Sequence, residues 1–390
     1  MQNRVAGAAQ GWALVFLSGL PAMAIVSLVP NLPQLFQRFG QLPHAGLLVP
    51  MVLTIPSLCI ALLSTAIGAL SDRIGRRPVL LVSLAIFMTV GLLPVFMNDL
   101  TAVLLTRLPV GIAEAGIIAT QNAMLGDYFE GQARERWLGV VSLVNPILAG
   151  AFVLAGGVLG AASWHLPFLL YLVGLPMLIW SFVSLFEPAR QGAAAGAGAA
   201  VARGFPWKTS ALVALVTLGV SVLYYVQAVQ LGRIFGEHGI ADPARIGLYV
   251  TLASVGVMLG GALYPKLAKA AFAFQFAAVL LSYALGYVGL GLAGSIATAL
   301  AAAVVAQFGN GLGIPVMIGW ALSRFDAQDR GSGMGTWAAG FFAGTFLSPP
   351  FVSLIQHYTG SFLSAVAGVG VICAAVALVL GGLASRQTQG

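Results

Sequence analysis

The sequence predicts an all-α membrane protein with twelve transmembrane helices, and three observations support this prediction. First, 59% of the 390 residues are hydrophobic and only 7% are charged, whereas soluble proteins carry about 25% charged residues. Second, the charges fall between long apolar blocks rather than along helix faces. Third, each block has about 20 residues or more, enough for a helix to cross a hydrocarbon core of about 30 Å. Strands exposed to lipid would leave backbone groups unpaired, so helices are expected.

Twelve apolar blocks follow one another along the chain. The predicted spans cover residues 12–36, 46–70, 79–97, 100–123, 137–160, 165–186, 209–233, 245–266, 271–293, 296–322, 331–355 and 361–384. No cleavage site of small residues follows a short apolar core in the first block. We therefore expect that block to be a retained helix rather than a signal peptide.

Positive charge sets the predicted orientation. With the N-terminus in the cytoplasm, the inner side holds 14 of the 18 basic residues, namely Arg4, Arg73, Arg76, Arg77, Arg134, Arg136, Arg190, Arg203, Lys208, Lys266, Lys269, Arg324, Arg330 and Arg386. The outer side holds Arg38, Arg233 and Arg245, and Arg107 lies within a span. This asymmetry follows the positive-inside rule and places both termini in the cytoplasm. Because the basic residues are spread over many cytoplasmic segments, they do not form a nucleic-acid footprint.

The chain is predicted to divide in the middle. Residues 187–208 read EPARQGAAAGAGAAVARGFPWK, the longest polar or low-complexity interval, and are expected to form a flexible cytoplasmic linker. They separate six spans in residues 1–186 from six in residues 209–390. Weak repeats at an offset of about 200 residues, such as Arg107 with Gln307, suggest two related halves. Two pseudo-symmetric six-helix bundles with a substrate site between them are a known transporter plan.

A polar turn follows the second span and reads GALSDRIGRRPVLL, from Gly68 to Leu81. The run Gly68-x-Leu70-Ser71-Asp72-Arg73-x-Gly75-Arg76-Arg77-x-x-Leu80 resembles the most diagnostic motif of the major facilitator superfamily. Supporting matches are Arg107-x-x-x-Gly111, the GDYF run from Gly126 to Phe129, and Trp164-His165 before Phe168. The resemblance covers the whole chain. It implies the twelve-helix fold of that superfamily, in a branch similar to drug and metabolite exporters.

The resemblance also implies a cytoplasmic gate that braces the outward-facing state. The predicted gate residues are Gly68, Asp72, Arg73, Gly75, Arg76, Arg77 and Asp127. Asp72 would lie against the N-terminus of span 11, where the helix dipole and free N–H groups stabilise a carboxylate. Arg73 would pair with Asp127. The alternative is that the arginines only anchor the turn to anionic lipid and set the topology.

Two ionisable residues lie deep within span 4. Glu114 is the only acidic residue deep in any predicted span, and Arg107 is the only basic one. Their spacing of seven corresponds to about two helical turns, and an ionisable residue at this depth is a functional hypothesis by default. We predict that both residues bind substrate or couple protons, because substrate, arginine and proton can compete for one desolvated carboxylate. The alternative is a structural pair that holds span 4 against a neighbour.

Other polar and aromatic side chains form stripes on the predicted spans. In the family, spans 1, 4, 7 and 10 line the substrate cavity. The resemblance therefore suggests, on these spans, the cavity residues Asn31, Gln34, Gln121, Ser221, Tyr224, Gln227, Gln307 and Asn310. Span 5 adds Asn145, and span 11 adds Trp337 and Phe341. Each of these can also be a helix-packing contact. The second half offers amides and aromatic rings without an intramembrane charge, which suits an organic solute with apolar surface and few polar groups.

Several signals are missing from the sequence. No phosphate-binding loop is present, so ATP is not expected to drive transport, and no cofactor is predicted beyond protons as the coupling ion. The histidines are far apart and suggest no metal site, and Cys59 and Cys373 fall in mid-span without a redox framework. No arrangement of catalytic residues supports an enzyme. A channel is disfavoured because no ring or filter sequence repeats.

We therefore predict a transporter that works by alternating access and exports a small amphiphilic organic solute in exchange for protons. The alternative is proton-coupled uptake of a nutrient such as a sugar, a carboxylate or a metal chelate. Asn145-Pro146-x-x-Ala149-Gly150 only partly matches the antiporter element of the family. His165 replaces the arginine that usually follows the residue at Trp164 in the family. The expected partners are a small-molecule substrate and the lipid bilayer, with no nucleic acid. The expected state is a monomer in a bacterial inner (plasma) membrane.

Overall fold

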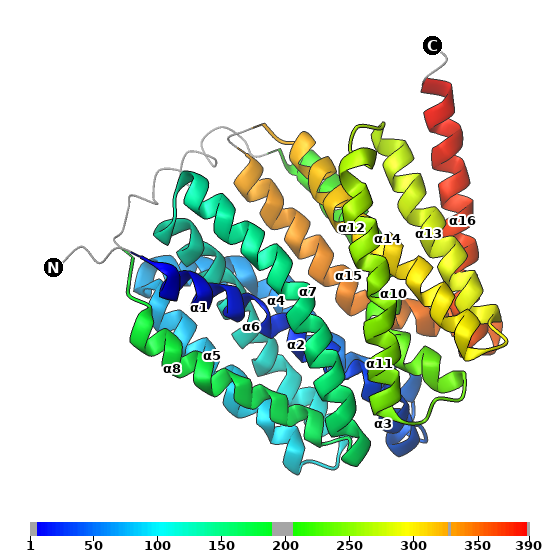
Figure 1. Ribbon diagram of the computed structural model, residues 1–390, viewed down its shortest axis with the longest axis horizontal. Coiled ribbons are helices and arrows are strands. Elements are labelled where there is room, and N and C mark those ends of the chain that lie inside the picture. Colours follow the sequence, from blue (N-terminus) through cyan, green and yellow to red (C-terminus); the bar gives the residue numbers. More distant parts are fainter. Residues whose placement is uncertain (1–5, 189–205, 327–328, 388–390) are drawn as a thin grey trace. The chain divides into compact units, whose positions relative to one another are not determined.

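The computed structural model describes residues 6–188, 206–326 and 329–387, and every regular element in these ranges is a helix (Figure 1). Twelve helical segments of the described chain are long and apolar enough to cross a membrane. They are Ala8–Phe39, Ala45–Ile74, Arg76–Phe96, Leu100–Tyr128, Gly131–Ala162, Leu166–Ser184, Trp207–Glu237, Pro243–Leu267, Phe272–Leu292, Ile296–Ser323, Gly333–Thr359 and Phe362–Leu380. Each overlaps one predicted span, which confirms the all-α membrane fold.

The described residues form two compact units. The first unit contains residues up to Leu28 and those from Met51 to the end of the sixth span. Its elements are α1 (Ala8–Ser18), α2 (Leu20–Val26), most of α4 (Ala45–Ile74), α5 (Arg76–Leu92), η2 (Leu93–Phe96), α6 (Leu100–Tyr128), α7 (Gly131–Ala162), η3 (Leu166–Val173) and α8 (Gly174–Ser184). Helix α6 packs against α5 and α1, and α7 packs against α1 and α2.

The second unit contains residues Val29–Pro50 and those from Pro206 onward. Its elements are η1 (Val29–Asn31), α3 (Leu32–Phe39), the start of α4, α10 (Trp207–Glu237), α11 (Pro243–Ala253), α12 (Val255–Leu267), α13 (Phe272–Leu292), α14 (Ile296–Ser323), α15 (Arg330–Thr359) and α16 (Phe362–Gln387). Helix α13 lies beside α14 and α16, and α10 lies beside α15. Small residues permit the close packing. A Cβ atom at Gly286, for example, would lie 2.5 Å from that of Ala306.

The first span is broken rather than straight. It consists of α1, α2, the short 3₁₀ turn η1 and α3. Pro30 and Pro33 lack the N–H that a continuous helix would donate to the carbonyls of Val26 and Val29, and the α-helix is interrupted at this point by η1. The break coincides with the boundary between the units, because the first unit includes Leu28 and the second unit begins at Val29.

The predicted division into residues 1–186 and 209–390 stays a prediction. The units observed differ from it in one respect, because residues 29–50 group with the second half of the chain. Most of the predicted linker, 187–208, lies outside the described residues.

Candidate functional site

Arg107 is fully buried in α6, and its charge is stabilised by hydroxyl groups and aromatic rings. Its Nη1 donates a hydrogen bond to the hydroxyl of Tyr171 at 2.9 Å. Its Nε and Nη2 donate to Oγ1 of Thr106 at 3.2 and 3.1 Å. The guanidinium also lies over the ring of Phe168, 5.1 Å from the centroid, a distance typical of a cation–π contact. Arg107 is therefore held in place by groups other than a carboxylate.

Glu114 lies two turns further along α6 and is also fully buried. Among the described residues, neither of its carboxyl oxygens has a hydrogen-bond partner. No ion pair joins it to Arg107 in this part of the chain. A buried carboxyl group without a partner is costly when it is ionised. The geometry therefore gives no support to a structural pair of these two residues, and it leaves Glu114 available for a proton or a ligand.

Two glycines explain why Glu114 is so well enclosed. Gly111 lies against α4, where a Cβ atom would come within 2.6 Å of the Cα of Pro56. Gly116 faces Ser83 of α5, whose side chain a Cβ atom would strike. Small residues on either side of Glu114 thus let both neighbouring helices approach α6 closely.

The other two predicted residues of the first unit extend the polar surface. Gln121 lies on the same α6 stripe, seven residues beyond Glu114, and is buried. Asn145 is half-buried in α7 and accepts a hydrogen bond from Ser18 of α1 at 3.0 Å. Asn145 therefore joins two helices, which agrees with the packing alternative.

The polar cavity residues predicted in the second unit are partly engaged with one another and with the backbone. Ser221 donates to the carbonyl of Phe341 at 2.5 Å. Gln227 donates through Nε2 to the carbonyl of Ala303 at 2.9 Å. Asn310 donates to Oε1 of Gln307, also at 2.9 Å. Among the described residues, Oε1 of Gln227 and Oδ1 of Asn310 have no hydrogen-bond partner, so two amide oxygens remain as acceptors.

Aromatic rings cluster where α10 meets α15. Trp337 and Phe341 stack with centroids 5.2 Å apart and planes inclined by 15°. Tyr224 and Tyr225 meet the ring of Phe341 edge-on, at 5.8 and 5.5 Å. Nε1 of Trp337 is buried and, in the described chain, has no acceptor. The sequence analysis missed Tyr225, although its position next to Tyr224 was a usable signal.

The two cavity residues predicted on span 1 belong to the second unit. Asn31 is buried and ends the 3₁₀ turn η1, and Gln34 is half-buried in the first turn of α3. The break in the span thus separates them from the first-unit residues of the same span.

The predicted gate motif forms a compact charged cluster at the start of α5. Arg76 forms an ion pair with Asp127 of α6 and a second one with Asp72 at 3.5 Å. The sequence analysis did not foresee the pair of Asp127 with Arg76, and the expected pair of Asp127 with Arg73 stays a prediction. Residue 76 opens α5 beyond the turn at Gly75, and this turn directs its side chain to α6 in a way that sequence spacing alone does not reveal.

Glu187 completes this cluster and was missed by the sequence analysis. Its two carboxylate oxygens accept the backbone N–H groups of Arg76 and Arg77, at 2.7 and 2.9 Å. It therefore caps the N-terminus of α5, where a negative charge is stabilised by the helix dipole. Gly75 permits the turn because its φ is +111°, a region that favours glycine. The available signal was that Glu187 is the only acidic residue in the interval 187–208.

The gate motif also contains Gly68, whose carbonyl accepts a hydrogen bond from Ser71 at 2.7 Å. Arg77 donates to the carbonyl of Phe182 at 2.7 Å and lies over its ring. The predicted contact between Asp72 and the start of span 11 joins residues of different units and stays a prediction.

The twelve membrane-length helices of the described residues define an integral multi-pass membrane protein. A model of the Major Facilitator Superfamily matches residues 12–289. The chain therefore belongs to this family of transporters, and it is a transporter with a small-molecule substrate rather than an enzyme.

Curated relatives match parts of the chain. Tetracycline resistance protein, class C, of Escherichia coli is 34% identical over 184 residues, which is 44% of this chain and 44% of that protein. Inner membrane transport protein YnfM of Escherichia coli K12 is 33% identical over 114 residues, 29% of this chain and 27% of that protein. These alignments span less than half of the relatives' length. Among solved structures, the nucleoside transporter NupG matches with a TM-score of 0.78 over 97% of this chain and 99% of that chain, at 13% identity.

Proposed function

We propose that the protein exports a small amphiphilic organic compound in exchange for protons, by alternating access across a bacterial inner membrane. The family is one of transporters. Relatives named as tetracycline resistance proteins favour export over uptake, and YnfM is named as an inner-membrane protein.

The observation that carries the proposal is the environment of Glu114. It is a fully buried carboxyl group without a hydrogen bond among the described residues. A proton neutralises such a group, and a cationic group or a hydrogen-bond donor on a substrate can replace the proton. Competition of this kind for one carboxyl couples the two movements. Arg107 supports this role because its donors are already engaged by Tyr171 and Thr106, so it does not occupy Glu114 permanently.

The second unit supports the amphiphilic character of the substrate. Its candidate lining contains the stacked rings of Trp337 and Phe341 and the open acceptors of Gln227 and Asn310. Rings bury the apolar part of a ligand, and a few placed polar atoms fix its orientation.

The direct test is transport of tetracycline, used as a probe, by purified protein in liposomes with an imposed pH gradient. We expect Glu114→Gln to abolish flux driven by the gradient, because glutamine cannot release a proton, while tetracycline exchange without a gradient partly survives. Glu130→Gln is the matched control, because Glu130 is exposed at the start of α7 and should keep the flux of the wild type. Gradient-driven flux that is unchanged in Glu114→Gln would remove the proton role.

The same assay decides the direction of transport. An exporter that exchanges its substrate for protons moves the probe outward while protons flow inward, so the two solutes cross the membrane in opposite directions. Movement of probe and protons in the same direction would instead support the nutrient-uptake alternative.

A further inference from the structure

Span 1 packs against α10 at the end that is predicted to lie on the outer side, and two glycines of α10 permit this contact. Gly232 and Gly236 lie one helical turn apart, as in the G-x-x-x-G pattern that lets membrane helices approach closely. A Cβ atom at Gly232 would collide with the carbonyl oxygen of Val29. Pro33 has no N–H to donate to this oxygen. A Cβ atom at Gly236 would lie 2.7 Å from Cγ of Pro33. The broken stretch of span 1 thus fits against this face of α10.

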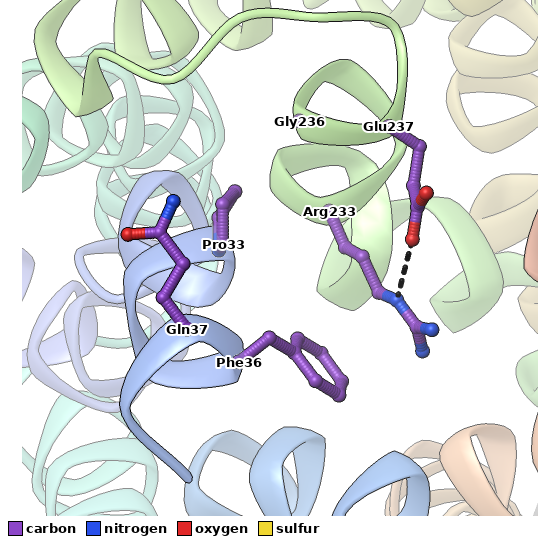
Figure 2. Close-up of a pocket in the computed structure, with 6 residues that line it drawn as sticks. All are labelled: Pro33, Phe36, Gln37, Arg233, Gly236 and Glu237. Atoms are coloured by element: carbon purple, nitrogen blue, oxygen red, sulfur yellow. Dashed lines mark ion pairs between the residues drawn. The ribbon is translucent and has the colours of Figure 1, made fainter. Parts of the chain in front are cut away.

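Arg233 lies between the two glycines and is enclosed by aromatic rings. Its guanidinium carbon is 4.1 Å from the ring centroid of Phe36 in α3 and 3.8 Å from that of Phe362 at the start of α16. Both distances are well within the range of cation–π contacts. Nε of Arg233 also faces Glu237 at 3.6 Å (Figure 2). One side chain of α10 therefore links spans 1, 7 and 12.

An open pocket lies beside this contact. It has a volume of about 320 Å³, opens to the surface, and is lined by Pro33, Phe36, Gln37, Arg233, Gly236 and Glu237. Figure 2 shows the α3 residues facing the α10 residues across this space. The segment that makes this contact begins at Val29, where span 1 passes from the first unit to the second. The contact therefore joins α10 and α16 to a part of span 1 that is set apart from the rest of that span by the break at η1.

We propose that Arg233 is a positioning residue for transport, which holds the outer end of span 1 on spans 7 and 12 while the outer side is closed and releases it when that side opens. The segment that it holds carries Asn31 and Gln34, two of the predicted cavity residues. A contact made in one state only shifts the equilibrium toward that state. Loss of the contact therefore favours the outward-open state. The inference requires alternating access but neither proton coupling nor a particular substrate.

The test is a distance measurement between spin labels at Arg38→Cys and Ser295→Cys, in full-length protein whose Cys59 and Cys373 are replaced by alanine. Both labelled positions are exposed, and both belong to the second unit. We expect Arg233→Gln to increase the population with the longer distance by about fivefold or more, as for the loss of two cation–π contacts. Arg245→Gln is the matched control, because Arg245 is an exposed arginine on the same predicted side and should give the distribution of the wild type.

A second pair of variants separates clamping from general stability. Phe362→Leu removes one ring and should lengthen the distances, whereas Phe362→Tyr keeps the ring and should restore the distribution of the wild type. This pair also decides the question if Arg233→Gln cannot be purified. If the distributions for Arg233→Gln or Phe362→Leu match the wild type, with or without a lower melting temperature, the residues only stabilise the fold and the proposal is overturned.

Discussion

At the scale of single residues, the two buried ionisable groups of α6 differ in their hydrogen-bond partners. Arg107 has a hydroxyl acceptor on Tyr171 and a ring beneath it, whereas Glu114 has no hydrogen bond in the described chain. The guanidinium group fits this environment because its planar face stacks on a ring and its N–H groups donate hydrogen bonds. A lysine would keep the charge and lose both features. Replacement of Arg107 and replacement of Glu114 are therefore expected to have different effects.

A double-mutant cycle tests the link between Arg107 and Tyr171. We expect Arg107→Lys and Tyr171→Phe each to lower the unfolding free energy and to couple by about 1 kcal/mol, since hydrogen bonds inside membrane bundles average somewhat below that value. Arg107→Lys should also reduce tetracycline flux in liposomes, because a point charge does not reproduce the fork. Tyr358→Phe, at an exposed tyrosine, is the control. If the losses of unfolding free energy are additive and Arg107→Lys keeps full flux, Arg107 contributes only a positive charge at this position.

At the scale of the element, the start of α5 depends on one backbone conformation. Gly75 has a φ of +111°, and the chain turns there so that the first N–H groups of α5 meet the carboxylate of Glu187. Four N–H groups at a helix start lack partners within the helix. The turn and the cap therefore act together, and they place Arg76 against Asp127.

The substitution Gly75→Ala should destabilise the start of α5 in two ways. The φ of residue 75 lies outside the region that alanine favours, at a cost of order 1–3 kcal/mol. The new Cβ atom would also lie 3.0 Å from a carboxylate oxygen of Glu187. We expect a lower melting temperature in a thermal unfolding assay. Gly131→Ala provides the comparison. It also has a positive φ, +50°, but has no atom within 4 Å of the added carbon, so it should cost less. Equal losses in the two variants would show that neither the larger φ of Gly75 nor its contact with Glu187 adds to the cost.

At the scale of the whole molecule, the membrane spans could be predicted from the sequence, but the contacts between them could not. Span length follows from hydrophobic thickness, which can be read along one dimension. Helix tilt and rotation are set by packing against neighbours. For this reason the pairing of Arg76 with Asp127 and the bond from Arg107 to Tyr171 could not be predicted. The prolines of span 1 were visible in the sequence, but the attachment of residues 29–50 to the second unit depends on contacts with α10 that only the fold provides.

The predicted gate motif also concerns the whole molecule, because it should bias the transport equilibrium. If Asp72 contacts the start of span 11 only when the cytoplasmic side is closed, Asp72→Asn should favour the inward-facing state. Charge–dipole energies of about 0.3–2 kcal/mol correspond to a shift of roughly 2- to 30-fold. Spin labels at Glu130→Cys and Asp326→Cys, which follow spans 4 and 10, would report it. Distributions that superimpose on the wild type across pH would leave the motif as a topology anchor.

The two gates can then be set against each other in one molecule. Arg233→Gln is expected to favour the outward-open state and Asp72→Asn the inward-facing one, and the two residues lie at opposite ends of the predicted spans. Because distant sites without shared partners act additively within about 0.5 kcal/mol, the double variant should have populations between those of the single variants. The two label pairs, measured in separate samples, should report the same population for each variant. A double variant that follows one single variant alone would mean that one of the two contacts does not differ between the states.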